Sequence, residues 1–309
     1  MSVAEQVSHS RRRLQRLVQF PPMRILIALA FIGAAYLAGG FGLGLLLLRA
    51  LQAVSTDQSV FGRALYIAMV LLLVHVAYVS YVHLIEKRQV AELAANRCMV
   101  DIGKGVLLGV VVGILVFGVL WILHCLEIVQ IGTWHVLLPA LLTAVTAGYW
   151  EELVFRGIFF RIVEESLGTW LTLALSAAVF GLLHLKNPNA SITGALAIAL
   201  TGGIVLGAAY VLTRSLWTPI GAHVTWNFIQ GGVLGAPVSG KVVAGGFLQT
   251  RLSGNPLLSG GKFGPEASVL AVVVGVVLGG WLCTKARNRG RVIVPVWRRG
   301  ETTAVSLAD

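Results

Sequence analysis

Two adjacent carboxylates, Glu151 and Glu152, end a long uncharged stretch of the sequence. The preceding run, 133–150, contains no Asp, Glu, Lys or Arg. An ionised carboxylate is costly in hydrocarbon without a partner or water, so charge at such a position indicates a functional site. Two imidazoles, His184 and His223, follow in later apolar stretches. A carboxylate and an imidazole that share one water can remove its proton, so these residue types predict hydrolysis.

The spacing of these residues predicts different roles for them. Glu152 and Arg156 are four residues apart on a helix in the favourable acid-first order, so we expect them to pair as a structural brace. Glu151 points about 100° away from Glu152 and is expected to face a cavity. His223 and Asn227 share one helix face and could donate hydrogen bonds to an oxyanion. Glu151 and His184 would then activate the attacking water.

Composition indicates an integral membrane protein. Hydrophobic residues make up 57% of the 309 and charged residues only 12%, about half the charged fraction of soluble domains. The formal charge is +11, but most Lys and Arg flank apolar runs, which favours a topological role over nucleic-acid binding. Three widely spaced cysteines predict neither a disulfide framework nor a thiolate metal site.

The predicted fold class is an all-α, polytopic bundle of about eight transmembrane helices around an intramembrane catalytic cavity. Each apolar run is near the roughly 20 residues that a spanning helix needs. The expected spans are 24–50, 61–84, 105–129, 134–160, 168–187, 190–213, 216–235 and 266–284. Residues 1–133 would supply a basic N-terminal segment and three helices, 134–285 the catalytic core, and 286–309 a basic cytoplasmic tail.

Charge asymmetry predicts the orientation. With the N-terminus inside, the inner segments hold 18 Lys and Arg residues and the outer segments five, with Arg49 left out. Positive charge near span ends resists translocation, so both termini are expected on the cytoplasmic side. The membrane is expected to be a bacterial-type cell membrane. The tail after Arg299 is expected to be frayed.

Helix geometry allows the three groups to converge. A turn near 164–168 would place Glu151 opposite His184 at one depth. Counted from Arg161, Glu151 lies ten residues, or roughly 15 Å, deep, and His223 lies roughly 12 Å into its own helix. We therefore expect one hydrated cavity that faces the cytoplasm.

These residues resemble the CAAX protease and bacteriocin-processing family of intramembrane endopeptidases. The family motifs EExxxR, FxxxH and HxxxN match Glu151 to Arg156, Phe180 to His184, and His223 to Asn227, in order. The stretch 260–266, Gly-Gly-Lys-Phe-Gly-Pro-Glu, also looks like the family. Glu266 itself is interpreted as a first-turn residue of the last helix, where a carboxylate meets the positive end of the helix dipole.

The resemblance implies cleavage of a membrane-associated peptide or protein, with Glu151 and His184 activating water and His223 and Asn227 binding the oxyanion. The resemblance implies no particular cofactor, because the family has been described both with and without metal. If zinc were bound, Glu151, His184 and His223 would be its ligands. Two alternatives are an ion- or proton-coupled transporter that uses buried Glu and His, and a catalytically silent membrane scaffold.

Overall fold

The computed structural model describes residues 17–44, 46, 49 and 60–299. The chain divides into two compact units, Met1–Val90 and Ala91–Asp309. Residues 1–16 of the predicted basic N-terminal segment and the tail after Arg299 lie outside the described residues. The domain boundaries at 133 and 285 were inferred from the positions of the sequence motifs, and they remain predictions.

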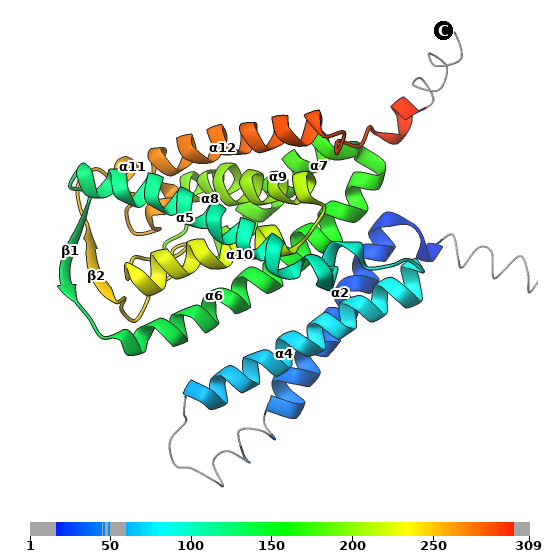
Figure 1. Ribbon diagram of the computed structural model, residues 1–309, viewed down its shortest axis with the longest axis horizontal. Coiled ribbons are helices and arrows are strands. Elements are labelled where there is room, and N and C mark those ends of the chain that lie inside the picture. Colours follow the sequence, from blue (N-terminus) through cyan, green and yellow to red (C-terminus); the bar gives the residue numbers. More distant parts are fainter. Residues whose placement is uncertain (1–16, 45, 47–48, 50–59, 300–309) are drawn as a thin grey trace, which may run out of the picture. The chain divides into compact units, whose positions relative to one another are not determined.

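In the part of the first unit that the structure describes, two α-helices pack side by side (Figure 1). Helix α2, Pro21–Leu37, starts with proline, which suits the first turn because its missing N–H needs no partner there. It continues as a π-helical segment, Ala38–Leu43. Helix α4, Val60–Tyr81, likewise runs into a π-helical segment, Val82–Glu86.

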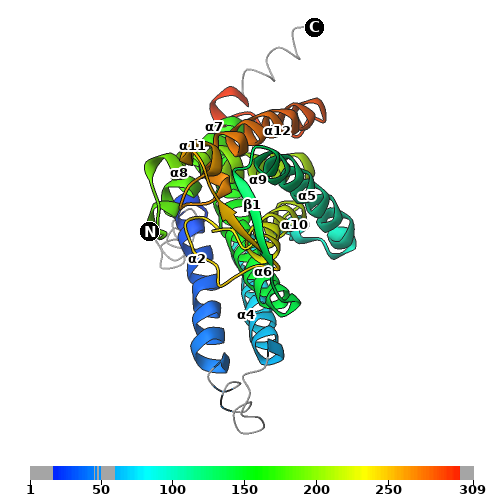
Figure 2. The same ribbon diagram turned by 90° about the vertical axis from the view of Figure 1, so that its left-hand side faces the viewer.

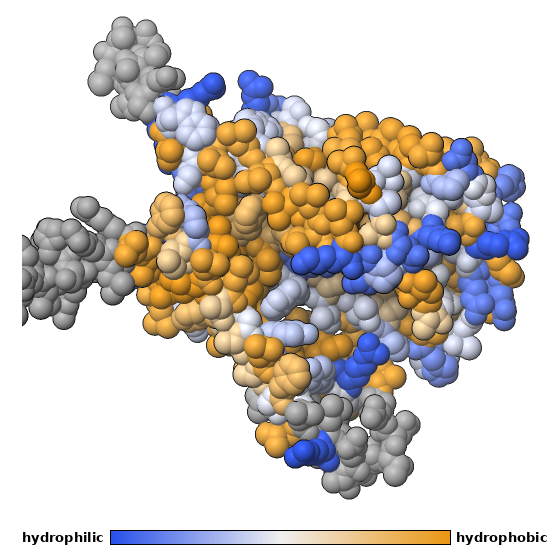
Figure 3. All heavy atoms as spheres, turned by 180° about the vertical axis from the view of Figure 1, so that it is seen from behind, coloured by the Kyte–Doolittle hydropathy of each residue, from blue (hydrophilic) through white to orange (hydrophobic). Residues whose placement is uncertain are grey.

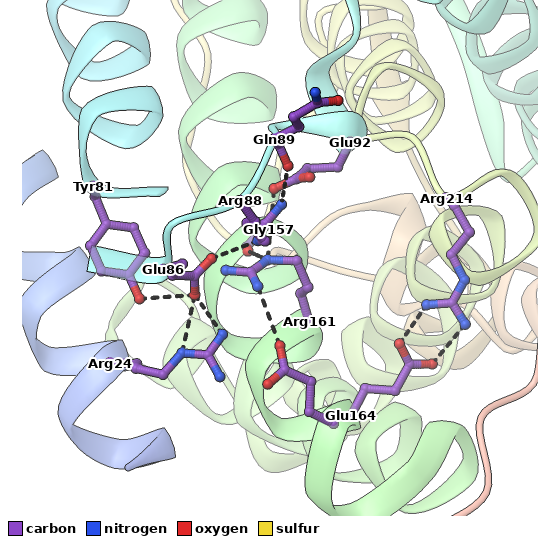
Figure 4. Close-up of polar contacts among 11 residues, drawn as sticks. Arg24, Tyr81, Glu86, Arg88, Gln89, Glu92, Gly157, Arg161, Glu164 and Arg214 are labelled. Carbon is purple, nitrogen blue, oxygen red and sulfur yellow. Dashed lines mark hydrogen bonds and ion pairs between the residues drawn. The ribbon is translucent and has the colours of Figure 1, made fainter. Parts of the chain in front are cut away.

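A buried carboxylate, Glu86, gathers polar groups within this unit. Arg24 Nη2 lies 2.6 Å from Glu86 Oε1, and the Tyr81 hydroxyl donates to the same oxygen at 3.0 Å. Arg88 Nε donates to Glu86 Oε2 at 2.8 Å, as the dashed lines in Figure 4 show. The charge is therefore compensated by two guanidinium groups, as burial requires.

The second unit is a helix bundle with a small sheet at one end (Figures 1 and 2). Its two strands are antiparallel and link segments far apart in the sequence. The helices are α5 Cys98–Ile122, α6 Leu137–Glu152, α7 Arg161–Leu183, α8 Ile192–Ile198, α9 Ile204–Thr213, α10 Trp217–Asn227, α11 Pro256–Ser259 and α12 Val269–Asn288. The strands are β1 Leu126–Ile131 and β2 Leu248–Leu252.

The predicted fold class, an all-α polytopic bundle, is confirmed. Six helical stretches of the described residues are long and apolar enough to cross a membrane. One of them, Trp134–Lys186, contains two predicted spans, and it is interrupted at Gly168, where the backbone is not helical. The predicted span 216–235 corresponds to α10 and the π-helical segment Phe228–Val233 that follows it.

The predicted span 105–129 is wrong at its C-terminal end. Helix α5 stops at Ile122, and His124 adopts a left-handed conformation with φ 54°. The chain then enters β1, where Leu126 pairs with Leu252 and Ile131 with Leu248. The prediction failed there because hydropathy alone cannot distinguish a short apolar strand from the continuation of an apolar helix.

Helix α5 lies tightly against α10 because glycines line the contact. A Cβ on Gly105 would come within 2.8 Å of Ala222 N, and one on Gly109 within 2.9 Å of Ala222 O. Close backbone approach at small residues is typical of helix pairs in membranes. Helix α10 carries His223, so α5 supports the helix that positions this imidazole.

The predicted turn near 164–168 is present at Gly168, which has φ 71° and interrupts the segment labelled α7. The segment after α12 packs on this turn: Thr169 N donates to Ile293 O at 2.9 Å, and Ile293 N donates to Thr169 Oγ1 at 2.8 Å. Glu164 accepts a hydrogen bond from Arg214 Nη2 at 3.0 Å (Figure 4). Residues from two distant parts of the sequence, Arg214 and Ile293, thus hold the turn.

The surface agrees with a membrane-embedded bundle. Figure 3 shows hydrophobic residues over much of the helical surface, and hydrophilic residues gathered at the end of the second unit that carries β1 and β2. Exposed apolar side chains such as Leu107, Ile114 and Val277 lie on α5 and α12. Large exposed apolar areas are unusual for soluble monomers and indicate contact with lipid.

Candidate active site

Glu151 and Glu152 are the last two residues of α6. The chain continues directly as a π-helical segment, Leu153–Phe160. π-Helical turns are rare and often occur at functional sites, because the extra residue re-aims the side chains that follow. This segment contains Arg156, which is fully buried.

The ion pair expected from the i,i+4 spacing is present. Arg156 Nη1 lies 2.8 Å from Glu152 Oε1, and both side chains are inaccessible to solvent. Arg156 Nη2 also donates to the carbonyl oxygens of Gly202 and Gly203, at 3.0 and 3.1 Å. Its guanidinium lies 4.8 Å from the ring centroid of Phe180. The pair therefore ties α6 to the helices on both sides of it.

His223 lies between the two carboxylates. Its Nδ1 is 2.9 Å from Glu152 Oε1, and its Nε2 is 3.8 Å from Glu151 Oε2. A carboxylate oxygen only accepts, so Nδ1 carries the hydrogen and Nε2 is the nitrogen turned toward Glu151. Glu152 thus orients an imidazole as well as bracing Arg156, a second role that the sequence did not indicate.

His184 is fixed in a similar way by the backbone. It follows the last residue of α7, and its Nδ1 lies 2.7 Å from Phe180 O. A carbonyl oxygen requires a donor, so Nδ1 bears the hydrogen and Nε2 has the free lone pair. The ring also lies 4.7 Å from the Phe180 ring, centroid to centroid. Phe180 therefore orients His184 through both its backbone and its side chain.

A cavity of about 90 Å³ brings several predicted residues together. Its lining includes His184, His223 and Asn227, and otherwise consists mainly of apolar side chains from α5, α9, α10 and α12. Glu151 is not part of the lining. Glu151 instead lies next to His223, which does line the cavity. Among the described residues, Glu151 forms no hydrogen bond with His184.

The structure adds Glu266 to this cavity. The interpretation of Glu266 as a first-turn residue is wrong, because α12 begins only at Val269, with Ser268 as its N-cap. The Glu266 carboxylate instead accepts hydrogen bonds from Ser239 N and Gln230 Nε2. It precedes the membrane-spanning helix, and burial raises the pKa of Glu266 to about 7. The resemblance of 260–266 to the family was the one signal for it.

The donor set does not form a metal site. Among the described residues, no three His, Cys, Asp or Glu side chains are arranged to hold a metal ion. Glu151 Oε2 lies 3.8 Å from His223 Nε2, and it forms no hydrogen bond with His184. The zinc ligand set considered from the sequence therefore does not fit this geometry, and no step below depends on a metal.

The fold and this cluster define a polytopic membrane protein with a buried acid–imidazole site. The family model described as Type II CAAX prenyl endopeptidase Rce1-like matches residues 133–229. This match confirms the resemblance to the CAAX protease family for the segment that contains all three motifs. Comparison with the curated proteins and with the solved structures found no match.

Proposed function

We propose that this protein is an intramembrane endopeptidase that cleaves a membrane-associated peptide or protein with an activated water. The observation that carries the proposal is the position of His223, which is held by Glu152 on one side and faces Glu151 on the other. Burying two carboxylates and an imidazole inside an apolar bundle costs desolvation free energy, and the Glu152–Arg156 pair does not require Glu151 or His223. Catalysis accounts for that cost.

Glu151 and His184 are proposed to activate the water. Glu151 Oε2 has no hydrogen-bond partner among the described residues, and His184 Nε2 is free to accept. The water oxygen attacks the carbonyl carbon of the scissile bond while its proton passes to one of these groups. That proton then goes to the leaving nitrogen as the carbon–nitrogen bond breaks.

His223 and Asn227 are proposed to stabilise the oxyanion that forms in this step. Both line the cavity, and they are four residues apart on α10. The Asn227 amide is a neutral donor, while donation from His223 Nε2 requires the imidazolium form. Donors fixed before the reaction stabilise the transition state without reorganisation.

The substrate and the cellular location are also part of this proposal. The substrate is a peptide or protein associated with the bilayer, and the enzyme is a multi-pass protein of a bacterial-type cell membrane with both termini in the cytoplasm. The apolar lining of the cavity, including Leu108, Val112 and Val205, suits an apolar substrate segment.

Comparative peptidomics of membrane fractions tests the proposal. Cells that produce the wild type should contain cleaved membrane peptides that disappear with Glu151→Gln, at equal protein level. Uptake or current in liposomes without any cleavage would instead support a transporter, and a host pathway unaffected by Glu151→Gln would support a scaffold.

A further inference from the structure

The Glu266 carboxylate lies where two segments of the cavity wall meet. Glu266 belongs to a short 3₁₀ turn, Pro265–Ala267, and is only 2% exposed. Its Oε2 accepts a hydrogen bond from Gln230 Nε2, and its Oε1 accepts one from Ser239 N. One acid side chain therefore joins the segment after α10 to the turn that contains Ser239.

Gln230 belongs to the continuation of the helix that carries the two proposed oxyanion donors. Helix α10 ends at Asn227 and runs without a break into the π-helical segment Phe228–Val233. Gln230 follows Asn227 by three residues, which is less than one turn of helix. The Gln230 side chain is fully buried, and its Nε2 also donates to Pro237 O. This helix end is thus held by a side-chain amide that depends on Glu266.

The second segment is a tight turn, 238–241, that contributes Ser239 to the cavity lining. Val238 and Lys241 pair through two backbone hydrogen bonds of 3.0 and 2.9 Å. The residues between them have positive φ, 50° at Ser239 and 80° at Gly240, as a two-residue type I′ turn requires. Neither backbone bond uses the Ser239 N–H, which Glu266 accepts instead.

The backbone before Glu266 leaves room for this cluster of polar groups. Gly264 has φ 125°, a conformation that residues with a Cβ rarely adopt. A Cβ on Gly264 would lie 2.6 Å from Glu266 Oε2 and 3.0 Å from Gln230 Nε2, and it would also meet Pro237 O. The sequence therefore places a glycine where the carboxylate, the amide and the carbonyl pack together.

We propose that Glu266 is a positioning residue that clamps Gln230 against the turn at Ser239 and thereby fixes the helix end next to Asn227. Glu266, Ser239 and Asn227 line the same cavity, so the clamp sets both sides of the space where an oxyanion would form. Helix ends fray unless they are held, and a displacement of about 1 Å can lower a catalytic rate about 10²-fold. The clamp rests on these contacts, while its effect on turnover also rests on the proposed function.

Hydrogen exchange of the full-length protein in detergent tests the clamp without using activity. Deuterium uptake is followed by mass spectrometry in the wild type, in E266A and in the control E127A, which removes a surface acid paired with Arg251 on the neighbouring strand. E266A should speed exchange in 228–241 and leave α7 residues 161–183 unchanged, and E127A should change neither. Unchanged exchange in 228–241 would overturn the clamp. Faster exchange throughout the second unit would also overturn it, because it would show a general loss of stability.

E266Q keeps the test decisive if E266A does not fold. An amide offers one acceptor oxygen where a carboxylate offers two, so Gln at 266 cannot accept from both Ser239 N and Gln230 Nε2. E266Q should therefore speed exchange in 228–241 relative to E127A. Exchange at the wild-type rate in E266Q would overturn the clamp.

A double-mutant cycle on turnover tests whether Glu266 acts through Gln230. E266A and Q230A should each lower kcat by about 10–100-fold with little change in KM, because displaced donors weaken transition-state stabilisation. E266A/Q230A should be no slower than the slower single variant, because residues that share one interaction are not additive. Additive losses, or a raised KM with unchanged kcat, would overturn the positioning role. A wild type that cleaves no membrane peptide would instead count against the proposed function, and hydrogen exchange would still decide whether the clamp exists.

Discussion

His223 and Arg156 share one acceptor atom: Glu152 Oε1 lies 2.9 Å from His223 Nδ1 and 2.8 Å from Arg156 Nη1. The charge that compensates a buried guanidinium is thus the same charge that orients an imidazole. Stability and catalytic geometry are coupled at this oxygen, and substitutions of Arg156 and of Glu152 should separate the effects.

Arg156→Met should destabilise the protein, because it leaves Glu152 buried without its guanidinium. Loss of one partner of a buried ion pair costs about 3–5 kcal/mol. Glu152→Gln should also destabilise the protein, because Arg156 then keeps only neutral acceptors. It should in addition lower cleavage by about 10²–10⁴-fold, because the imidazole loses its charged acceptor. Thermal unfolding in detergent and a cleavage assay measure both, and equal stability losses without a difference in activity would contradict the coupling.

Glu151→Gln should abolish most cleavage while leaving the fold intact. Glu151 makes no hydrogen bond through Oε2, so an isosteric amide removes only the proton acceptor. General-base catalysis contributes about 10²–10⁴-fold, which is the expected loss. Single-turnover cleavage measures it, with Glu127→Gln on exposed β1 as the control. Near-native rates in Glu151→Gln would exclude this glutamate as the base.

Asn227→Ala should lower kcat by about 10²–10³-fold with little change in KM, because an oxyanion donor acts mainly in the transition state. Gln130→Ala, at an exposed position in β1, is the control for a lost amide. A raised KM with unchanged kcat would show instead that Asn227 binds the ground-state substrate.

Gly105→Ala and Gly103→Ala form a matched pair on α5. A Cβ at Gly105 meets the backbone of α10, including Gly221 Cα at 2.9 Å, whereas a Cβ at Gly103 meets nothing within 4 Å. Gly105→Ala should lower the melting temperature and cleavage together, because it displaces the helix that carries His223. Gly103→Ala should be neutral or slightly stabilising. Similar melting temperatures for the two variants would contradict the close α5–α10 contact.

The buried acid Glu266 predicts a pH dependence of stability. Its pKa is raised from 4.5 to about 7 by burial. Between these values the folded state keeps a proton that the unfolded state has released. Stability should therefore fall as pH rises from about 4.5 to 7, and level off above that, a change of about 3 kcal/mol. Glu266→Gln should remove this difference, as melting curves across the range would show. A parallel pH profile in the variant would contradict it.

Local spacing in the sequence predicted the features that involve residues of one helix or of one turn. The Glu152–Arg156 pair follows from four residues of separation, and the turn near 164–168 follows from a glycine after two acids. Both are present. The eight apolar runs likewise predicted the bundle, because hydrophobic length alone indicates a spanning helix.

Contacts between helices could not be predicted in the same way. The Glu152–His223 hydrogen bond joins residues 71 positions apart and depends on how each helix is rotated. The π-helical segment after Glu152 changes that rotation, and no residue type in the sequence predicts a π-helical segment there. Glu266 was missed because a proline–glutamate pair reads equally well as a helix start, and only the folded loops bring it to Ser239.

The docking of Ile293 on Thr169 has a consequence for biosynthesis. These two residues are 124 positions apart, and the hydrogen bonds between them close the turn that joins the helices of Glu151 and His184. Because a ribosome adds Ile293 long after Thr169, this turn stays without its partner while most of the second unit is being inserted. The nascent protein can therefore complete this turn only after Ile293 has been added.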